Sequence, residues 1–215
     1  MKTVAFVPIK MNNERLPGKN TKLLSNGKPL ISYILETLKK VCSVDEIYVY
    51  CSNPAIQGFL PEGVIFLKRS EHLDLSTTSF NEVLTSFARD VQADIYILTH
   101  ATAPFIQPQT FEKAVEALKF GEYDSALSVT KMQEFIWKDG KPFNYKVESI
   151  PRTQDLEPFY VETCGMYIYT RQLILEENRR IGHKPFLVEV SKIEACDIND
   201  GDDFVIADAI SQALE

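Results

Sequence analysis

The chain has 215 residues, which fits one ordinary domain with a substantial core. Its net charge of −7 argues against a nucleic-acid polymer as partner, and it has no run of about 18 apolar residues that would span a membrane. The four apolar residues after Thr3 are too few for a secretory signal, and the four scattered cysteines form no CxxC pair, so we expect a cytoplasmic protein without disulfides or zinc.

Short apolar segments alternate with amphipathic segments along the first 130 residues. The expected strands are residues 4–9, 46–51, 64–67, 94–99 and 125–130, and the expected helices are residues 29–41, 79–91 and 109–120. This alternation indicates βαβ units, and therefore an α/β fold with a mostly parallel sheet and helices on both faces. In such sheets ligands bind beyond the carboxyl ends of the strands.

The alternation stops between residues 131 and 160. Asp139-Gly140 stands between two aromatic segments there and predicts a hairpin, which either projects to contact another subunit or is a plain surface insertion. Beyond it the pattern resumes, with expected strands at 165–169 and 185–190 and expected helices at 171–180 and 203–214. With no linker or internal repeat, residues 1–215 are interpreted as one domain.

Positive charge is concentrated near the first strand. Between Met1 and Lys28 the chain has six lysines and arginines against the single acid Glu14. The loop at residues 8–20 is neither GxGxxG nor a Walker P-loop, but it offers Lys10, Arg15 and Lys19 on a turn that leaves a strand. A triphosphate needs fixed cations and exposed backbone N–H groups, and Arg15 and Lys19 are the best candidates to stabilise a departing pyrophosphate. A solvated loop is the alternative.

A second polar cluster, at residues 197–203, contains four aspartates. Mg²⁺ is commonly held by one or two carboxylates while phosphates and water complete its octahedron, and Asp197 is our candidate ligand. Asp200, Asp202 and Asp203 are better explained as capping or dipole residues of the last helix.

Other polar residues follow the remaining strands. His100 and Thr102 follow the strand expected near the sheet centre and offer hydrogen bonds to a base or ribose, although a lone histidine is more often structural. Arg69 follows another strand end. Arg152, beside the hairpin, is suited to a substrate carboxylate, and a structural salt bridge is its equal competitor.

Together these segments resemble the acylneuraminate cytidylyltransferases, in order and along nearly the whole chain. The segments that carry the resemblance are Val7-Pro8 to Asn20 with Arg-Leu-Pro-Gly-Lys-Asn, Lys68-Arg69-Ser70-Glu71, Thr99 to Pro104, Arg152-Thr153-Gln154-Asp155, Tyr160 to Tyr167 and Asp197-Ile198-Asn199. The resemblance implies a glycosyltransferase-A-like, Rossmann-related fold. It also implies a homodimer in which the projecting element of one subunit covers the sugar site of the other.

The resemblance also implies roles for individual residues. Those assigned to the nucleotide are Pro8, Lys10, Asn13, Arg15, Lys19, Asn20, Arg69, His100 and Thr102. Those assigned to the sugar are Arg152, Gln154, Glu162, Thr163 and Tyr167, and those assigned to Mg²⁺ are Asp197 and Asn199. Five positions depart from the usual family pattern: Lys10 replaces Arg, Asn13 replaces Ser or Thr, His100 replaces Gln, Thr163 replaces Asn and Asn199 replaces Asp.

The sequence therefore predicts a magnesium-dependent cytidylyltransferase that transfers CMP from CTP to an acidic nine-carbon sugar of the sialic-acid type and releases pyrophosphate. One alternative is another sugar nucleotidyltransferase, of the 3-deoxy-manno-octulosonate or sugar-phosphate type. A second is a catalytically inactive nucleotide-binding homologue, which the change at Asn199 favours. No side chain is identified as the general base.

Overall fold

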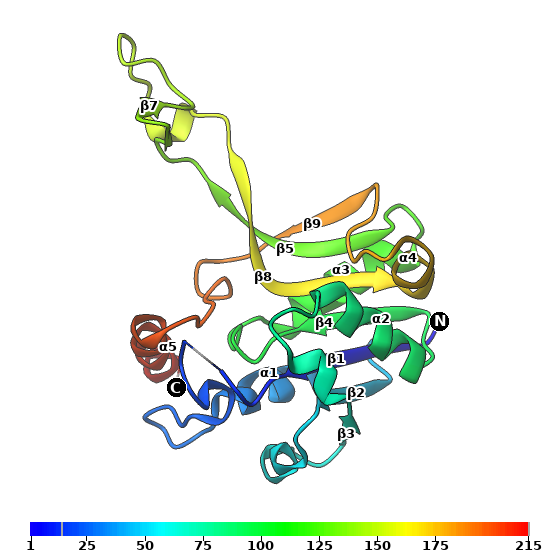
Figure 1. Ribbon diagram of the computed structural model, residues 1–215. Helices are drawn as coiled ribbons and strands as arrows, with labels where there is room; N and C mark the ends of the chain where they lie inside the picture. The colour runs from blue at the N-terminus through cyan, green and yellow to red at the C-terminus, as the bar shows by residue number, and fades with distance from the viewer. Residues whose placement is uncertain (14, 215) are drawn as a thin grey trace.

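The computed structural model describes residues 1–13 and 15–214 and is built on a seven-stranded sheet in the order β3-β2-β1-β4-β8-β5-β9 (Figure 1). The strands of this sheet are β1 (Thr3–Ile9), β2 (Glu46–Cys51), β3 (Val64–Lys68), β4 (Ile95–Thr99), β5 (Ser125–Met132), β8 (Phe159–Thr170) and β9 (Pro185–Glu189). Strand β8 is antiparallel to both of its neighbours, β4 and β5, whereas the other pairs are parallel. The predicted mostly parallel α/β sheet is confirmed.

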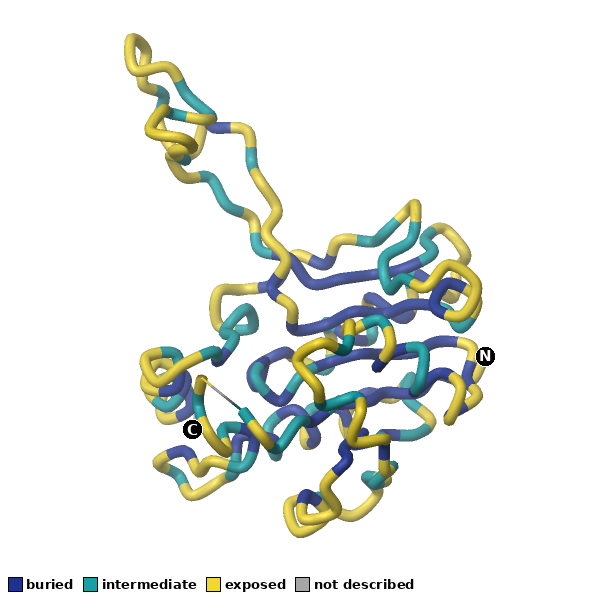
Figure 2. The backbone as a smooth tube through the Cα atoms, in the orientation of Figure 1, coloured by how far each residue is buried: buried dark blue, intermediate teal, exposed yellow. Residues whose placement is uncertain are grey.

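Helices cover both faces of the sheet. They are α1 (Leu30–Leu38), α2 (Phe80–Asp90), α3 (Pro108–Lys119), α4 (Arg171–Glu177) and α5 (Gly201–Ala213). Helices α1 and α3 pack with Val7 and its neighbours in one core cluster, and α2 and α4 pack in a second cluster centred on Phe87. Phe87 stacks on Phe6 of β1 with ring centroids 3.9 Å apart. The central strands are therefore buried on both sides, which is why they consist of continuous apolar residues (Figure 2).

The longest strand differs most from expectation. The sequence predicts a strand over residues 165–169, but β8 begins six residues earlier, at Phe159. Its pairing with β5 is interrupted by a bulge, because Leu127 faces Tyr167 while Val129 already faces Glu162. Within the bulge Cys164 adopts the left-handed region, with φ 57°. At this bulge Cys164 lines a cavity together with His100 and Thr102, which follow the carboxyl end of β4.

Residues 133–158, here called the arm, project from the sheet between β5 and β8 (Figure 1). The predicted hairpin is present: β6 (Trp137–Lys138) pairs with β7 (Lys141–Pro142) across Asp139 and Gly140, which both have positive φ. Most of the arm is exposed (Figure 2). It therefore has little core of its own to hold it against the rest of the chain.

Several helix boundaries also differ from the sequence prediction, and α1 ends at Leu38 rather than at residue 41. Helix α4 ends at Glu177 rather than at residue 180, because Asn178 takes the left-handed C-cap conformation. Helix α5 begins at Gly201, directly after its N-cap Asp200. The described residues also form short 3₁₀ segments that the sequence does not predict: η1 (Lys19–Thr21), η2 (Pro54–Phe59), η3 (Glu71–Asp74) and η4 (Thr153–Asp155). In the described part of the chain, no helix is long and apolar enough to cross a membrane.

Candidate active site

The loop after β1 is held in shape by a buried asparagine. The Asn20 side chain donates from Nδ2 to the Lys10 carbonyl at 3.1 Å and to Asn13 Oδ1 at 3.5 Å. Gly18, with φ 67°, makes the turn that leads into η1. Glu14 lies outside the described residues. The Asn20 side chain therefore stabilises the conformation of the loop, which turns back beside the end of β1.

Three segments that are distant in sequence meet at this edge of the sheet. Lys19 Nζ donates to the carbonyl of Ile198 at 2.8 Å, and the backbone N–H of Ile198 donates to the carbonyl of Thr102 at 2.9 Å. The loop, the end of β4 and the aspartate cluster therefore surround one cavity of about 360 Å³. Its lining residues are Pro8, Lys10, Asn13, Arg15, Lys19, Asn20, His100, Ala101, Thr102, Cys164, Asp197 and Asn199.

Charges in the cavity act on one another. Burial lowers the pKa of Lys19, the cation Arg15 lowers it further, and Asp197 and Asp203 oppose this. Burial also lowers the pKa of His100 to about 4, with the Arg180 cation as the next cause. The imidazole is thus neutral near pH 7, and the cavity combines cations, a carboxylate and a neutral histidine.

The aspartate cluster divides into two roles. Asp200 caps α5 through its contacts with the N–H groups of Asp202 and Asp203, and Asp203 returns a bond to the N–H of Asp200. The capping interpretation of Asp200 and Asp203 is therefore confirmed. Asp197 instead lines the cavity, where it accepts a 2.8 Å hydrogen bond from the Asn199 amide.

No group of three or more histidine, cysteine or acidic residues in the described chain could hold a metal by itself. That suits Mg²⁺, which needs only one or two protein oxygens when phosphates supply the rest. Asp197 and Asn199 together offer a carboxylate and an amide oxygen at the cavity wall. This donor set fits the ion.

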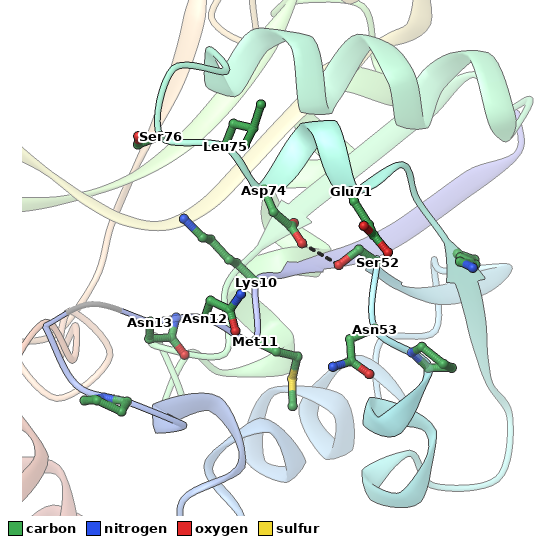
Figure 3. A pocket seen from close by; sticks show the side chains of 13 residues that line it. Lys10, Met11, Asn12, Asn13, Ser52, Asn53, Glu71, Asp74, Leu75 and Ser76 are labelled. Carbon is green, nitrogen blue, oxygen red and sulfur yellow. Dashed lines mark hydrogen bonds between the residues drawn. The ribbon is translucent and has the colours of Figure 1, made fainter.

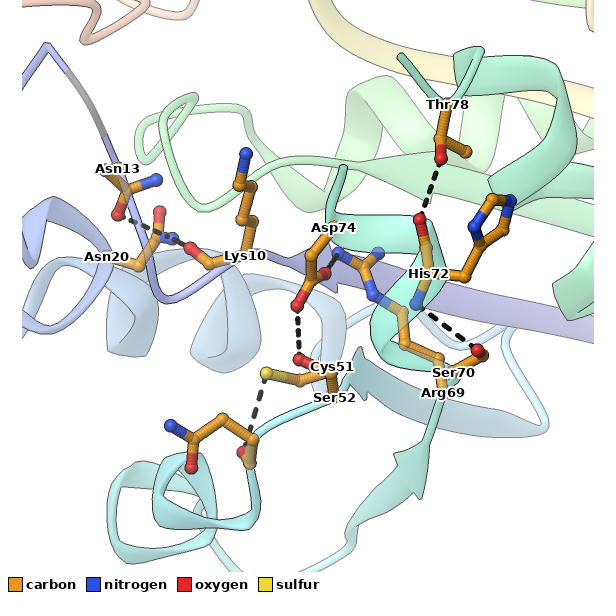
Figure 4. A network of polar contacts seen from close by, with 11 residues as sticks. Lys10, Asn13, Asn20, Cys51, Ser52, Arg69, Ser70, His72, Asp74 and Thr78 are labelled. Atoms are coloured by element: carbon orange, nitrogen blue, oxygen red, sulfur yellow. Dashed lines mark hydrogen bonds and ion pairs between the residues drawn. The ribbon is translucent and has the colours of Figure 1, made fainter. Parts of the chain in front are cut away.

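Figure 3 shows the lining of a larger cavity, of about 1,050 Å³. It shares Lys10 and Asn13 with the first cavity and therefore adjoins it. It lies between the loop and the ends of β2 and β3, next to η3. Arg69 is buried beside this cavity and does not line it, because its guanidinium contacts Asp74 Oδ1 at 2.5 Å (Figure 4). Asp74 also accepts a hydrogen bond from Ser52. In this arrangement Arg69 supports the wall through Asp74.

Three of the residues assigned to the sugar, Glu162, Thr163 and Tyr167, lie around the bulge of β8. Glu162 accepts a 2.6 Å hydrogen bond from the Tyr167 hydroxyl, and Thr163 is buried against Ser128 with 2.7 Å between their hydroxyl oxygens. From β8 only Cys164 is among the described residues that line the smaller cavity. Sequence reasoning missed Cys164; its one available signal was Gly165, since a glycine inside a strand often marks a bulge.

Arg152 and Gln154 belong to the arm, which projects from the sheet (Figure 1), and they do not line the cavity. Arg152 Nε donates to Asp155 Oδ2 at 2.7 Å at the start of η4. This is the structural salt bridge that the sequence left open as the alternative to a role in substrate binding. The Gln154 carbonyl accepts from Gln133 at 3.2 Å. Within one chain, the structure does not bring these two residues to the other site residues.

The cavity with its cations and its carboxylate lies beyond the carboxyl ends of the strands, which is where α/β proteins with open, mostly parallel sheets bind nucleotides and other ligands. The family model for cytidylyltransferases matches residues 4–198, and the chain belongs to that family.

The chain is similar to two curated relatives and to one solved structure. It is 25% identical to N-acylneuraminate cytidylyltransferase A of Danio rerio over 214 residues, covering 95% of this chain and 49% of that protein. It is 29% identical to the CMP-N,N'-diacetyllegionaminic acid synthase of Legionella pneumophila, covering 99% of this chain and 97% of that protein. The chain thus spans about half the length of the N-acylneuraminate relatives it matches.

A solved structure of CMP:2-keto-3-deoxy-manno-octonic acid synthetase complexed with CTP shares the fold over both full chains. Its TM-score is 0.74 at 17% identity. The resemblance found in the sequence motifs is therefore confirmed at the level of family and fold.

Proposed function

We propose that the chain transfers CMP from CTP to a sialic-acid-like 2-keto sugar acid with release of pyrophosphate. The observation that carries the proposal is the convergence of Arg15, Lys19 and Asp197 on one cavity at the carboxyl edge of the sheet. Membership of the cytidylyltransferase family supports it, as do the relatives named for N-acylneuraminate and for diacetyllegionaminic acid.

In this reaction the anomeric hydroxyl of the sugar acid attacks the α-phosphorus of CTP, and the bond to the leaving pyrophosphate breaks. Arg15 and Lys19 hold the triphosphate and stabilise the charge that develops on the leaving group. Lys10 and Asn13 line both cavities, so the nucleotide extends from the smaller cavity toward the larger one. The sugar lies near Glu162 and the bulge of β8.

Magnesium is part of the proposal, with Asp197 and Asn199 as the residues that hold it. When bound there, Mg²⁺ would neutralise phosphate charge and orient the triphosphate. Asn199 supplies an oxygen without a charge, and its amide fixes the Asp197 carboxylate through their 2.8 Å hydrogen bond.

We also propose a cytoplasmic homodimer. The family resemblance suggests that the arm of one copy covers the sugar site of the other, and the exposed aromatic residues of the arm support this arrangement. Arg152 and Gln154 would then reach the sugar of the neighbouring copy. The four free cysteines suit a reducing compartment.

The test is a screen of nonulosonic acids and 3-deoxy-manno-octulosonate with Mg²⁺ and CTP, UTP or GTP, read by pyrophosphate release. We expect release with CTP and a nine-carbon acid. Preference for UTP or GTP would indicate another sugar nucleotidyltransferase, and CTP binding without turnover across the panel would indicate an inactive homologue.

The Arg15→Ala variant ties the activity to the cavity. Removing one cation that acts on the leaving group should lower the rate on the order of 100-fold or more. Lys28→Ala is the matched control, because Lys28 pairs with Glu36 at the surface. A near-normal rate for Arg15→Ala would remove Arg15 from the mechanism.

A further inference from the structure

Arg180 lies in the segment between α4 and β9, and an aromatic pair determines where it sits. Its guanidinium carbon is 3.6 Å from the centre of the Tyr167 ring and 5.4 Å from the centre of the Phe80 ring. An arginine stacked on a ring face keeps its N–H edge free for bidentate bonds in the plane of the guanidinium. The stacking therefore holds the side chain ready for a planar anion.

The backbone is fixed on both sides of Arg180. Asn81 of α2 donates to the carbonyl of Asn178 at 2.6 Å, and the N–H of Gly182 donates to Ser125 Oγ at 2.8 Å. Because both anchors belong to the sheet or to a helix packed on it, Arg180 is positioned before any ligand arrives. A preorganised cation costs less ordering entropy on binding.

A single side chain separates Arg180 from the residues that line the smaller cavity. The Tyr167 beneath it bonds through its hydroxyl to Cys164 Sγ at 3.6 Å, and Cys164 lines the cavity. On the other side, Phe80 contacts His100, another lining residue, with 5.6 Å between ring centroids. The charge of Arg180 also contributes to the lowered pKa of His100, which supports their closeness.

Arg180 also lacks an acidic partner. Among the described residues it forms no ion pair and no hydrogen bond, whereas Arg69 is tied to Asp74 and Arg152 to Asp155. Lys10, Arg15 and Lys19 line the cavity that the triphosphate would need. Arg180 is thus a cation without an ion pair among the described residues, and it lies outside the lining of the cavity proposed for the triphosphate.

From this geometry we infer that Arg180 is the residue that binds the carboxylate of the sugar acid and so selects an acid over a neutral sugar. The inference rests on the proposed function, because it names the receptor for one group of the proposed acceptor. Glu162 is hydrogen-bonded to the hydroxyl of the same Tyr167.

The experiment compares N-acetylneuraminate with its methyl ester in wild type and Arg180→Gln, at saturating CTP and Mg²⁺. Loss of a charge-assisted bidentate pair should raise KM for the acid on the order of 10- to 100-fold and leave KM for CTP unchanged. Wild type should discriminate against the ester, and Arg180→Gln should not. Arg180→Lys keeps the charge without the planar fork and should fall between them.

Arg179→Gln is the matched control, since Arg179 pairs with Glu177 at 2.7 Å within the same segment. It should leave KM for the acid unchanged. An Arg180→Gln enzyme that still prefers the acid over the ester, or a control variant with the same loss, would overturn the inference.

The same comparison by ligand-observed NMR needs no turnover. If no acceptor releases pyrophosphate, the proposed function fails; the assignment of Arg180 fails separately when wild type binds the acid no better than the ester.

Discussion

His100 illustrates how the fold sets the charge of a single side chain at the cavity. Its pKa is lowered to about 4 from an ordinary value of 6.5, first by burial and then by Arg180. Between these two pH values the unfolded chain binds more protons than the folded one. The stability that comes from a neutral His100 is therefore complete above pH 6.5 and is lost as the pH falls toward 4.

We expect the free energy of unfolding, measured with urea at pH 7.5 and pH 5, to decrease less in His100→Gln than in wild type. Glutamine is also the residue that the family resemblance leads one to expect at this position. His183→Gln is the control, because the His183 side chain is 79% exposed. Equal pH dependence in wild type and His100→Gln would contradict the assignment.

Among single residues, the sequence correctly predicted that charged side chains in the segments after strand ends lie near one another. Lys19 and Asp197 could be paired because the carboxyl ends of parallel strands share one edge. Cys164 and Arg180 could not be predicted: the first depends on a bulge, and the second on a ring that packs beneath it from another element. The packing of Arg180 leaves no local pattern in the sequence, and the one local signal for Cys164 was the neighbouring Gly165.

Strand β8 shows that sequence patterns also fail to predict those parts of an element that depend on tertiary pairing. Its second half is buried on both faces and has the apolar residues that predict a strand. Its first half is mostly exposed, and it is a strand only because it pairs with β5 at the base of the arm. Its antiparallel direction depends on chain topology, and residue periodicity does not reveal direction.

Gly165 allows the bulge of β8 to pack closely against the segment after β4. A Cβ at this position would lie 2.4 Å from Ile106 Cδ1 and 3.2 Å from Ala103 Cβ. Gly165→Ala should therefore destabilise the fold by about 1–3 kcal/mol, measured by urea unfolding.

Ile106→Val removes the closest atom and should restore part of that stability in the double variant. Gly58→Ala, where an added Cβ meets open space, should change stability little. Full additivity of the two substitutions would contradict the contact.

At the scale of the molecule, the arm exposes more apolar surface than a small projection can bury by itself. Trp137 is 59% exposed and Ile150 is 65% exposed. If the arm packs on a second copy, a Trp137→Ser, Ile150→Ser double variant should convert a dimer to a monomer in light scattering, with its circular dichroism unchanged. Phe120→Ser, at an 80% exposed position outside the arm, should remain dimeric.

A dimer of this kind has a stronger consequence, because each active site would draw its loop from one chain and its arm from the other. Arg15→Ala damages the loop and Arg152→Ala damages the arm, so each variant alone should be nearly inactive. Mixing them by unfolding and refolding produces heterodimers in which one site has both defects and the other has none. Random pairing makes half of the molecules heterodimers, and the mixture should recover roughly a quarter of the wild-type rate. No recovery, when a different affinity tag on each variant shows by sequential pull-down that mixed dimers form, would mean that the arm serves the site of its own chain.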